Sequence, residues 1–126
     1  MGAGFSLVWE VEFRLKTDAP EAIRARMDAA YAKKKASQPV TAKSAGCVFK
    51  NPPAETGAQS AGLLLDQAGM RGKTLGGMAF SSLHANFLVN LGSGTPAQAL
   101  ELLDLGRSAV RARFGVDLET EVVVLK

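Results

Sequence analysis

The chain has 126 residues, of which 47% are hydrophobic and 21% are charged, and its net charge is +3. This length suits one compact domain, and the composition excludes an intrinsically disordered chain. The mild positive charge suits an anionic small molecule. A domain that binds nucleic acid usually carries a denser basic stripe with interleaved aromatic residues. We therefore expect a globular domain that has no nucleic-acid partner.

Metal and membrane chemistry have little support in the sequence. Cys47 is the single cysteine and His84 the single histidine, which rules out an intramolecular disulfide and disfavours a zinc site. The N-terminal segment has no basic region before an apolar run, and Glu10, Glu12 and Arg14 interrupt its apolar residues. We expect neither a signal peptide nor a membrane span, and a reduced, cytoplasmic domain.

Residues 5–15 (FSLVWEVEFRL) predict a strand, because apolar and polar side chains largely alternate from Val8 onward. The alternation shifts by one residue between Trp9 and Val11, which is consistent with a bulge. A helix is predicted next, with Asp18 capping its start, Glu21 reciprocating and residues 37–39 ending it. Its apolar face is expected to hold Ile23, Met27, Ala30 and Tyr31.

The middle of the chain is rich in loop signals. Residues 40–60 are predicted to be loop with one short apolar pair, Val48 and Phe49. Residues 60–69 predict a short helix that Gly69 stops, residues 71–78 predict turns, and residues 86–91 predict a short buried strand.

The clearest helix start is at Thr95, with Pro96 in the first turn and Gln98 completing a capping box. The helix is expected to end at Gly115. One face is predicted to pack through Leu100, Leu103, Val110 and Phe114, opposite the charged residues Glu101, Asp104, Arg107 and Arg111. Residues 116–125 predict a terminal strand. The element order favours an α+β fold, a small mixed sheet with helices packed on one side.

Two short stretches carry candidate chemistry. In residues 44–52, Gly46 allows close backbone approach, Cys47 offers a polarizable proton donor, and Lys50 and Asn51 offer a cation and an amide for a phosphate or sugar. The alternative is a plain loop with a buried, inert cysteine. Glu119 and Glu121 would share one face of the terminal strand, either exposed to solvent or with one of them facing a pocket.

Two basic features also leave alternatives open. His84 could bind a phosphate or simply hydrogen-bond a loop. Residues 33–35, three consecutive lysines, either contact a ligand or form the solvated, dipole-complementing end of a helix.

Taken in order, these motifs resemble one family. SAGCVFKNP, then SAGLLLDQAGMRGKTLGGMAFSSLHANFLVN, then the capped helix and FGVDLETEV, are similar to the C-terminal substrate-binding domain of UDP-N-acetylenolpyruvoylglucosamine reductases. The resemblance covers residues 37–126 and implies that fold. Residues 1–36 resemble the strand and helix at the junction with an FAD-binding domain that this chain lacks.

The resemblance implies a reaction of peptidoglycan precursor synthesis. The family reduces the enolpyruvyl ether of UDP-N-acetylglucosamine enolpyruvate to the lactyl ether of UDP-N-acetylmuramate, with NADPH as reductant and FAD as hydride carrier. It also implies that FAD is bound mainly by the absent part, so the isolated chain is expected to bind FAD poorly and to be inactive. The alternative is a truncated, stand-alone module that binds a nucleotide sugar.

The resemblance also implies residue roles. Cys47 stands where the family usually has a serine, as the proton donor; a thiol, with a pKa of about 8.5, is a stronger acid than a hydroxyl. Glu121 stands at the catalytic carboxylate, and the two are expected to share a cleft. Asn51, His84 and Lys35 fall at the contacts to the UDP diphosphate, with Lys34 as the alternative to Lys35. Some family members have glutamine at the His84 position.

Two surface properties follow from the same reasoning. Residues 33–35 with Lys43 and Lys50 would form a basic face for a diphosphate. The interface left open by the absent domain, including residues 5–15, is expected to allow self-association of the isolated chain.

Overall fold

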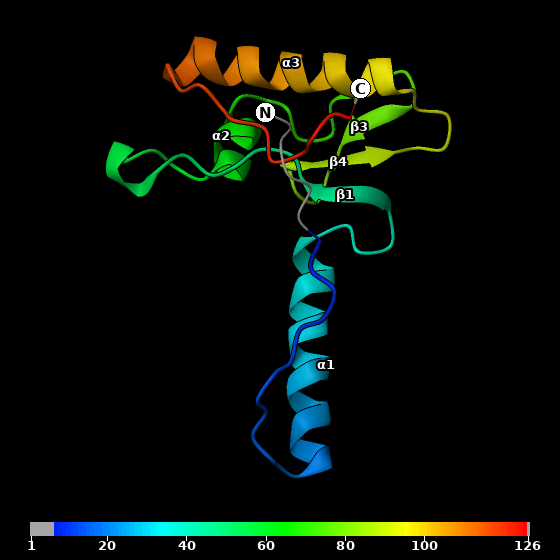
Figure 1. Ribbon diagram of the computed structural model, residues 1–126. Coiled ribbons are helices and arrows are strands. Elements are labelled where there is room, and N and C mark those ends of the chain that lie inside the picture. The colour runs from blue at the N-terminus through cyan, green and yellow to red at the C-terminus, as the bar shows by residue number, and fades with distance from the viewer. Residues whose placement is uncertain (1–6, 126) are drawn as a thin grey trace.

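The computed structural model of the chain describes residues 7–125, and its helices and strands follow the α+β class predicted from the sequence. Figure 1 shows α3 lying along the sheet while α1 projects away from it. Along the chain the elements are α1 (Pro20–Ser37), β1 (Lys43–Cys47), the 3₁₀ turn η1 (Ala54–Thr56), α2 (Ala61–Gln67), β2 (Thr74–Leu75), β3 (Met78–Phe80), β4 (Phe87–Asn90) and α3 (Pro96–Phe114).

The sheet has four strands in the order β1-β4-β3-β2. Each of its neighbouring pairs is antiparallel, where a mixed sheet was predicted. The connections from β2 to β3 and from β3 to β4 are too short for the crossover that a parallel pair requires. The sheet therefore grows by hairpins, and α2 and α3 cover one of its faces.

The core lies between this face of the sheet and the two helices. Phe80 of β3 is 0% exposed, and Leu65 of α2 and Leu102 of α3 are buried in the same cluster. Segments outside the strands contribute as well, through Val48, Phe49 and Leu118. The core cluster contains no residue from α1, which has no buried residue at all.

The predicted starts of α2 and α3 are confirmed. Ser60 accepts a hydrogen bond from the backbone of Leu63, and Thr95 and Gln98 form the predicted capping box. The buried face of α3 differs from the prediction. Leu103 and Val110 are buried as expected, but Leu100 is exposed and Phe114 is only half-buried. Leu102 and Gly106 face the core in their place.

The predicted strand over residues 5–15 is wrong for residues 7–15, which form no strand and are exposed; residues 5 and 6 lie outside the described residues. A strand needs a partner for its backbone N–H and C=O groups, and the described chain places none beside this segment. Helix α1 is confirmed, but the predicted cap is wrong, because the N-cap is Ala19 and makes no side-chain hydrogen bond. The Asp18 carboxylate instead pairs with Arg26 at 2.8 Å.

Two further predictions need correction. Strand β1 lies in the region predicted to be loop. Gly46 and the neighbouring prolines are typical of a loop, but the segment pairs with β4 and forms a strand. The predicted terminal strand over residues 116–125 is wrong: within residues 7–125 this segment forms one isolated bridge, between Phe49 and Thr120, and no strand. The strand predicted over residues 86–91 is confirmed as β4. None of the helices in residues 7–125 has the length and apolar character needed to cross a bilayer.

Candidate functional site

A β-bulge at the end of β1 presents Cys47. Ser44 pairs with Val89, whereas Cys47 pairs with Phe87, so β1 holds one more residue than β4 over this interval. Gly46 takes a φ of +92° there, a conformation that glycine adopts without strain. Bulges of this kind redirect the following side chain. Cys47 is exposed, and the alternative of a buried, inert cysteine is therefore wrong.

The C-terminal segment brings Glu121 beside Cys47. The backbone N–H of Glu121 donates to the carbonyl of Val48 at 2.8 Å, and the N–H of Lys50 donates to the carbonyl of Glu119 at 2.9 Å. These two bonds align residues 119–121 antiparallel to residues 48–50. The acid and the thiol, 74 positions apart in the sequence, thus sit on neighbouring segments of one short ladder.

The environment keeps the Cys47 thiol protonated. Partial desolvation of the thiol by its neighbours raises the pKa of Cys47, the negative charge of Glu121 raises it further, and a hydrogen bond with the Asn86 side chain opposes both effects. Because the net direction is upward, Cys47 is a neutral S–H group at physiological pH rather than a thiolate. A protonated thiol beside a carboxylate can donate a proton but is a weak nucleophile.

Asn86 holds this region in place, and the sequence reading missed it. Its side chain is 3% exposed and clamps the backbone of Phe49: the N–H of Phe49 donates to Asn86 Oδ1 at 3.0 Å, and Asn86 Nδ2 donates to the Phe49 carbonyl at 2.8 Å. The Asn86 carbonyl also accepts from the N–H of Val48 at 2.9 Å. One signal was available, a polar residue directly before the apolar run of β4.

The two glutamates of the terminal segment have different surroundings. Glu119 forms an ion pair and hydrogen bond with Lys50, which raises the pKa of that lysine. Glu121 instead acts electrostatically on Cys47. The charge of Lys50 is thus partly compensated within the chain, which weakens its predicted place in a basic face.

Asn51 and His84 both meet the first turn of α2. Asn51 Oδ1 accepts a hydrogen bond from the N–H of Ala61 at 3.0 Å, which leaves the amide N–H₂ of Asn51 as a donor. The ring of His84 lies against Gly62, where an added Cβ would come within 3.0 Å of its Cε1 atom. The structure therefore brings two of the three predicted diphosphate contacts to one place.

His84 is a neutral hydrogen-bonding group rather than a cation at this place. Burial lowers its pKa, and the positive charge of Arg71 lowers it further. Its Nδ1 accepts from the N–H of Asn86 at 3.2 Å, so the proton of the neutral ring lies on Nε2. That N–H can donate to an anionic oxygen. The ring also packs edge-on against Phe87, with centroids 4.8 Å apart.

The two lysines considered for the diphosphate differ in position. Lys34 lines an open cavity of about 280 Å³. The same cavity reaches Gly46, which precedes Cys47 in the sequence, and Phe87, whose ring packs against His84. Lys35 lines neither this cavity nor the four others described for the chain. The geometry therefore favours Lys34 over Lys35.

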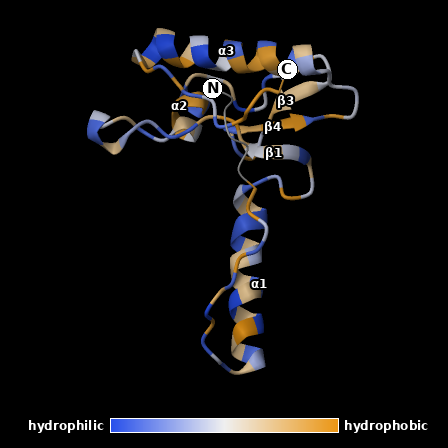
Figure 2. Cartoon of the chain, viewed as in Figure 1, coloured by the Kyte–Doolittle hydropathy of each residue, from blue (hydrophilic) through white to orange (hydrophobic). Residues whose placement is uncertain are grey.

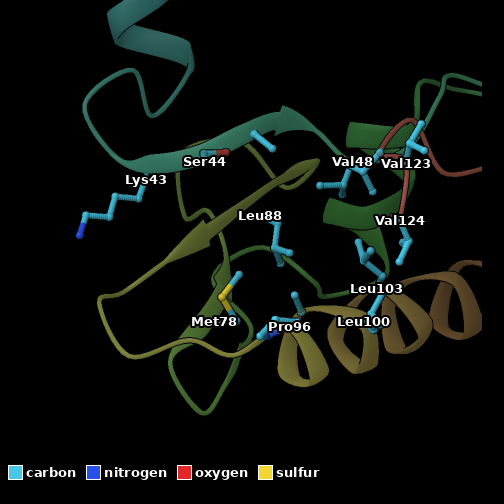
Figure 3. A pocket seen from close by; sticks show the side chains of 13 residues that line it. Lys43, Ser44, Val48, Met78, Leu88, Pro96, Leu100, Leu103, Val123 and Val124 are labelled. Carbon is cyan, nitrogen blue, oxygen red and sulfur yellow. The ribbon is translucent and has the colours of Figure 1, made fainter. Parts of the chain in front are cut away.

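The largest of the five cavities described for the chain, of about 400 Å³, lies between the sheet and the N-terminal half of α3. Figure 3 shows Leu88, Leu103 and Val124 around it, with the Lys43 side chain directed away. Its lining includes the sequence neighbours of Cys47 and Glu121, but neither residue itself. None of the five cavities described for the chain is lined by Cys47 or Glu121, so the cleft that these two groups were expected to share is not among those five. Within residues 7–125, no three His, Cys, Asp or Glu side chains gather as they would around a metal ion.

Comparison with known proteins points to one family. Residues 38–125 match the model of the UDP-N-acetylenolpyruvoylglucosamine reductase C-terminal domain. The chain is 52% identical to the UDP-N-acetylenolpyruvoylglucosamine reductase of Nitratidesulfovibrio vulgaris over 97% of its own length and 40% of that protein's. It is 49% identical to the protein of the same name from Oleidesulfovibrio alaskensis, over 96% of the chain and 40% of the relative.

A solved structure agrees with these matches. The crystal structure of UDP-N-acetylenolpyruvylglucosamine reductase (MurB) from Thermus caldophilus superposes with a TM-score of 0.64 at 39% identity, over 86% of this chain and 37% of that one. The chain therefore spans about two fifths of the length of the relatives that it matches.

Proposed function

We propose that this chain, which belongs to the family of UDP-N-acetylenolpyruvoylglucosamine reductase C-terminal domains, forms the substrate-binding part of a cytoplasmic oxidoreductase. The complete enzyme would reduce UDP-N-acetylglucosamine enolpyruvate to UDP-N-acetylmuramate during peptidoglycan synthesis. The observation that carries this proposal is the pairing of a protonated Cys47 thiol with Glu121 on one backbone ladder.

Cys47 is proposed to donate the proton that completes reduction of the enolpyruvyl double bond. Hydride addition to one carbon leaves negative charge that spreads toward the substrate carboxylate, and the adjacent carbon must then be protonated. A thiol whose pKa is raised keeps its proton at neutral pH until this charge develops. The exposed position of Cys47 at the end of β1 leaves it open to a substrate approaching from outside.

Glu121 is proposed to act on the same intermediate. Its negative charge raises the pKa of Cys47, so Glu121 helps to keep the thiol protonated. The carboxyl group of Glu121 is also proposed to interact with the enolic form of the substrate. Glu119 is not proposed for this role, because its ion pair with Lys50 turns it to a different partner.

The diphosphate is proposed to contact Asn51 and His84, with a lysine from the end of α1. Asn51 offers its amide N–H₂ and neutral His84 its Nε2–H, both at the first turn of α2. Lys34 supplies the cation in the favoured arrangement and Lys35 in the alternative. Two neutral donors and one cation would bind the diphosphate by hydrogen bonds and charge together.

The surroundings of Cys47 and Glu121 fit a flavin that another part of the enzyme brings to them. Neither residue lines a cavity described for this chain, and both are exposed. FAD, reduced by NADPH, would supply the hydride, whereas this chain supplies the proton donor and the sugar contacts. The chain alone is therefore proposed to bind FAD poorly. The alternative is a stand-alone module that binds the nucleotide sugar, which is favoured by a buried core formed from residues between Val48 and Leu118 of this chain.

The test uses a complete chain, made by joining the N-terminal part of the Nitratidesulfovibrio vulgaris relative to residue 1 of this one. This chain should oxidise NADPH only when UDP-N-acetylglucosamine enolpyruvate is present. Cys47→Ser should keep much of the rate, while Cys47→Ala should lose about 10²-fold or more. Equal rates for Cys47→Ala and the unmodified chain would show that Cys47 is not the proton donor.

Two controls separate the remaining possibilities. Glu119→Gln, beside the proposed acid in sequence, should leave the rate nearly unchanged, whereas Glu121→Gln should reduce it. Calorimetry of the 126-residue chain with the UDP-sugar tests the alternative, because heat of binding without any turnover would favour the stand-alone module. A joined chain that binds FAD but oxidises no NADPH with the sugar would overturn the proposed function.

A further inference from the structure

We infer that Asn86 is a positioning residue, which fixes the distance between the proton donor Cys47 and the diphosphate contact His84. Both of these roles rest on the proposed function. In the proposed substrate, the diphosphate and the enolpyruvyl ether are attached to different carbons of one sugar ring. A site for this substrate therefore has to hold two contact points at a fixed separation, and Asn86 is bonded to the chain on both sides.

Asn86 is bonded first to the segment that follows Cys47. Its side chain spans both backbone groups of Phe49, and its backbone carbonyl accepts from the N–H of Val48. Val48 and Phe49 are each 1% exposed, so these three hydrogen bonds are shielded from water. Because the N–H of Glu121 donates to the carbonyl of Val48, the same segment also carries the acid. Asn86 thus holds the ladder on which the thiol and the acid lie.

Asn86 is bonded also to His84, through its own backbone. Its N–H donates to Nδ1 of the ring at 3.2 Å, which leaves the protonated Nε2 on the far side of the ring. The turn that carries the ring has further support, because Ser81 Oγ accepts from the N–H groups of Leu83 and His84. Arg71 donates to the Leu83 carbonyl at 3.0 Å. The position of the ring is thus set relative to the backbone of Asn86.

The amide group of Asn86 joins these two halves. An amide offers one acceptor and one donor side by side, as the N–H and carbonyl of Phe49 require. Oδ1 accepts and Nδ2 donates, at 3.0 and 2.8 Å, although the two residues are 37 positions apart. Asn86 is 3% exposed and comes directly before the apolar stretch of β4 that Figure 2 shows. A buried, fully bonded side chain of this kind sets how far the histidine lies from the thiol.

Asn90 offers a matched control at the other end of β4. Its Oδ1 accepts from the N–H groups of Gly92 and Gly94 at 2.8 and 3.0 Å, and its Nδ2 donates to the Gly94 carbonyl at 3.3 Å. Asn90 thus clamps backbone groups as Asn86 does, but within the turn that follows it. Loss of either side chain should lower stability, whereas loss of Asn86 should also separate sugar binding from the surroundings of Cys47.

The first experiment measures how well the sugar protects Cys47. The joined complete chain is treated with iodoacetamide in the absence of NADPH, with and without saturating UDP-N-acetylglucosamine enolpyruvate, and alkylation of Cys47 is followed by peptide mass spectrometry. The sugar should slow alkylation about tenfold or more in the unmodified chain and in Asn90→Ala, because a bound sugar covers the thiol. In Asn86→Ala the protection should fall below about threefold, because the thiol no longer lies at a fixed distance from the bound diphosphate. Calorimetry should give a dissociation constant for the sugar within about threefold of the unmodified value, since the diphosphate contacts remain.

The second experiment separates kcat from KM in the same joined chains. Asn86→Ala should lower kcat for NADPH oxidation with the sugar by about tenfold or more, because a displacement of about 1 Å between reacting groups costs on that scale. KM for the sugar should change by less than about threefold. Asn90→Ala should leave both constants nearly unchanged.

Asn86→Leu is the second variant at this position. Leucine has the same branching as asparagine, so it removes the two side-chain hydrogen bonds without the cavity that alanine leaves. It should reproduce the loss of protection and the loss of kcat. Circular dichroism identifies the temperatures at which each variant is folded, and both experiments are carried out within that range.

The outcomes distinguish positioning from a purely structural role. Full protection of Cys47 together with unchanged kcat in a folded Asn86 variant would overturn the inference, as would equal losses in Asn86→Ala and Asn90→Ala. Failure of the proposed function has a different signature, because the sugar would then leave alkylation of Cys47 unaffected in the unmodified joined chain.

Discussion

Residues 7–37 and residues 43–125 both place apolar side chains at regular spacing, but only the second region buries them. Phe80 is 0% exposed and Phe13 is 76% exposed, although each lies in a short run with strand propensity. The difference comes from partners, since β3 is flanked by two strands and covered by α3, while residues 7–15 have no neighbouring strand in the described chain. Spacing shows which face of a segment is apolar, whereas the fold decides whether that face is covered.

The largest effect is expected from the same substitution made in each region. Phe80→Ala should lower the free energy of unfolding by about 3–5 kcal/mol, because it opens a cavity in the core. Phe13→Ala should change it by less than about 0.5 kcal/mol. Urea unfolding followed by circular dichroism measures both. A large loss for Phe13→Ala would mean that the N-terminal segment is packed after all, which would break the comparison.

A smaller effect is expected where the core meets the site. Asn86→Ala removes the side-chain partners of both the N–H and the carbonyl of buried Phe49. It should lower the free energy of unfolding by about 2 kcal/mol. The same urea experiment gives this value. Unchanged stability would show that the two hydrogen bonds are replaced by water, and that the region of Cys47 is not held by the core in the way described.

The bulge in β1 should tolerate change less well than its open surroundings suggest. No atom lies within 4 Å of the position that a Cβ of residue 46 would take, so Gly46→Ala costs backbone strain alone. We expect a loss of about 1 kcal/mol at a φ of +92°. Thermal unfolding of the two proteins compares them. A stabilised variant would mean that the positive φ is not required.

The smallest effect is a shift in the titration of Cys47. Because its pKa is raised, alkylation by iodoacetamide should rise only at a higher pH than for a free thiol. Glu121→Gln should move this profile to lower pH, and Glu119→Gln, whose partner is Lys50, should leave it in place. Identical profiles for the two variants would contradict the electrostatic effect of Glu121 on the thiol.

The free energy of unfolding should also depend on the protonation of Cys47. The folded chain retains the Cys47 proton at a pH where the unfolded chain has lost it, so this contribution is complete below about pH 8.5 and declines as the pH rises further. Urea midpoints at rising pH should therefore fall less in Cys47→Ser than in the unmodified chain.

The sequence predicted the elements whose signals are local. The capping box at Thr95, the Ser60 start of α2 and the end of α1 all depend on residues within one turn of each other, and the structure confirms them. Strand β1 and the terminal segment were misread because pairing depends on distant residues. Val89 and Phe87 make β1 a strand, whereas residues 116–125 have strong β propensity but gain one bridge only.

The candidate site was predicted through resemblance and only in part through chemistry. Composition alone favoured a buried cysteine, while the structure exposes Cys47 and places Glu121 beside it. Asn86 escaped notice because its role lies in bonds to Phe49, 37 positions away. The preference for Lys34 over Lys35 likewise needed the cavity that joins α1 to Gly46, which no spacing along the chain reveals.

The short ladder between residues 48–50 and 119–121 has a consequence for motion. Because Glu121 donates one of these two hydrogen bonds and Cys47 directly precedes Val48, which accepts it, any tilt of the domain as a rigid body would carry both residues together. If the domain closed onto a bound sugar, only the distance between the sugar and the ladder would have to change. The distance between Cys47 and Glu121 would stay the same.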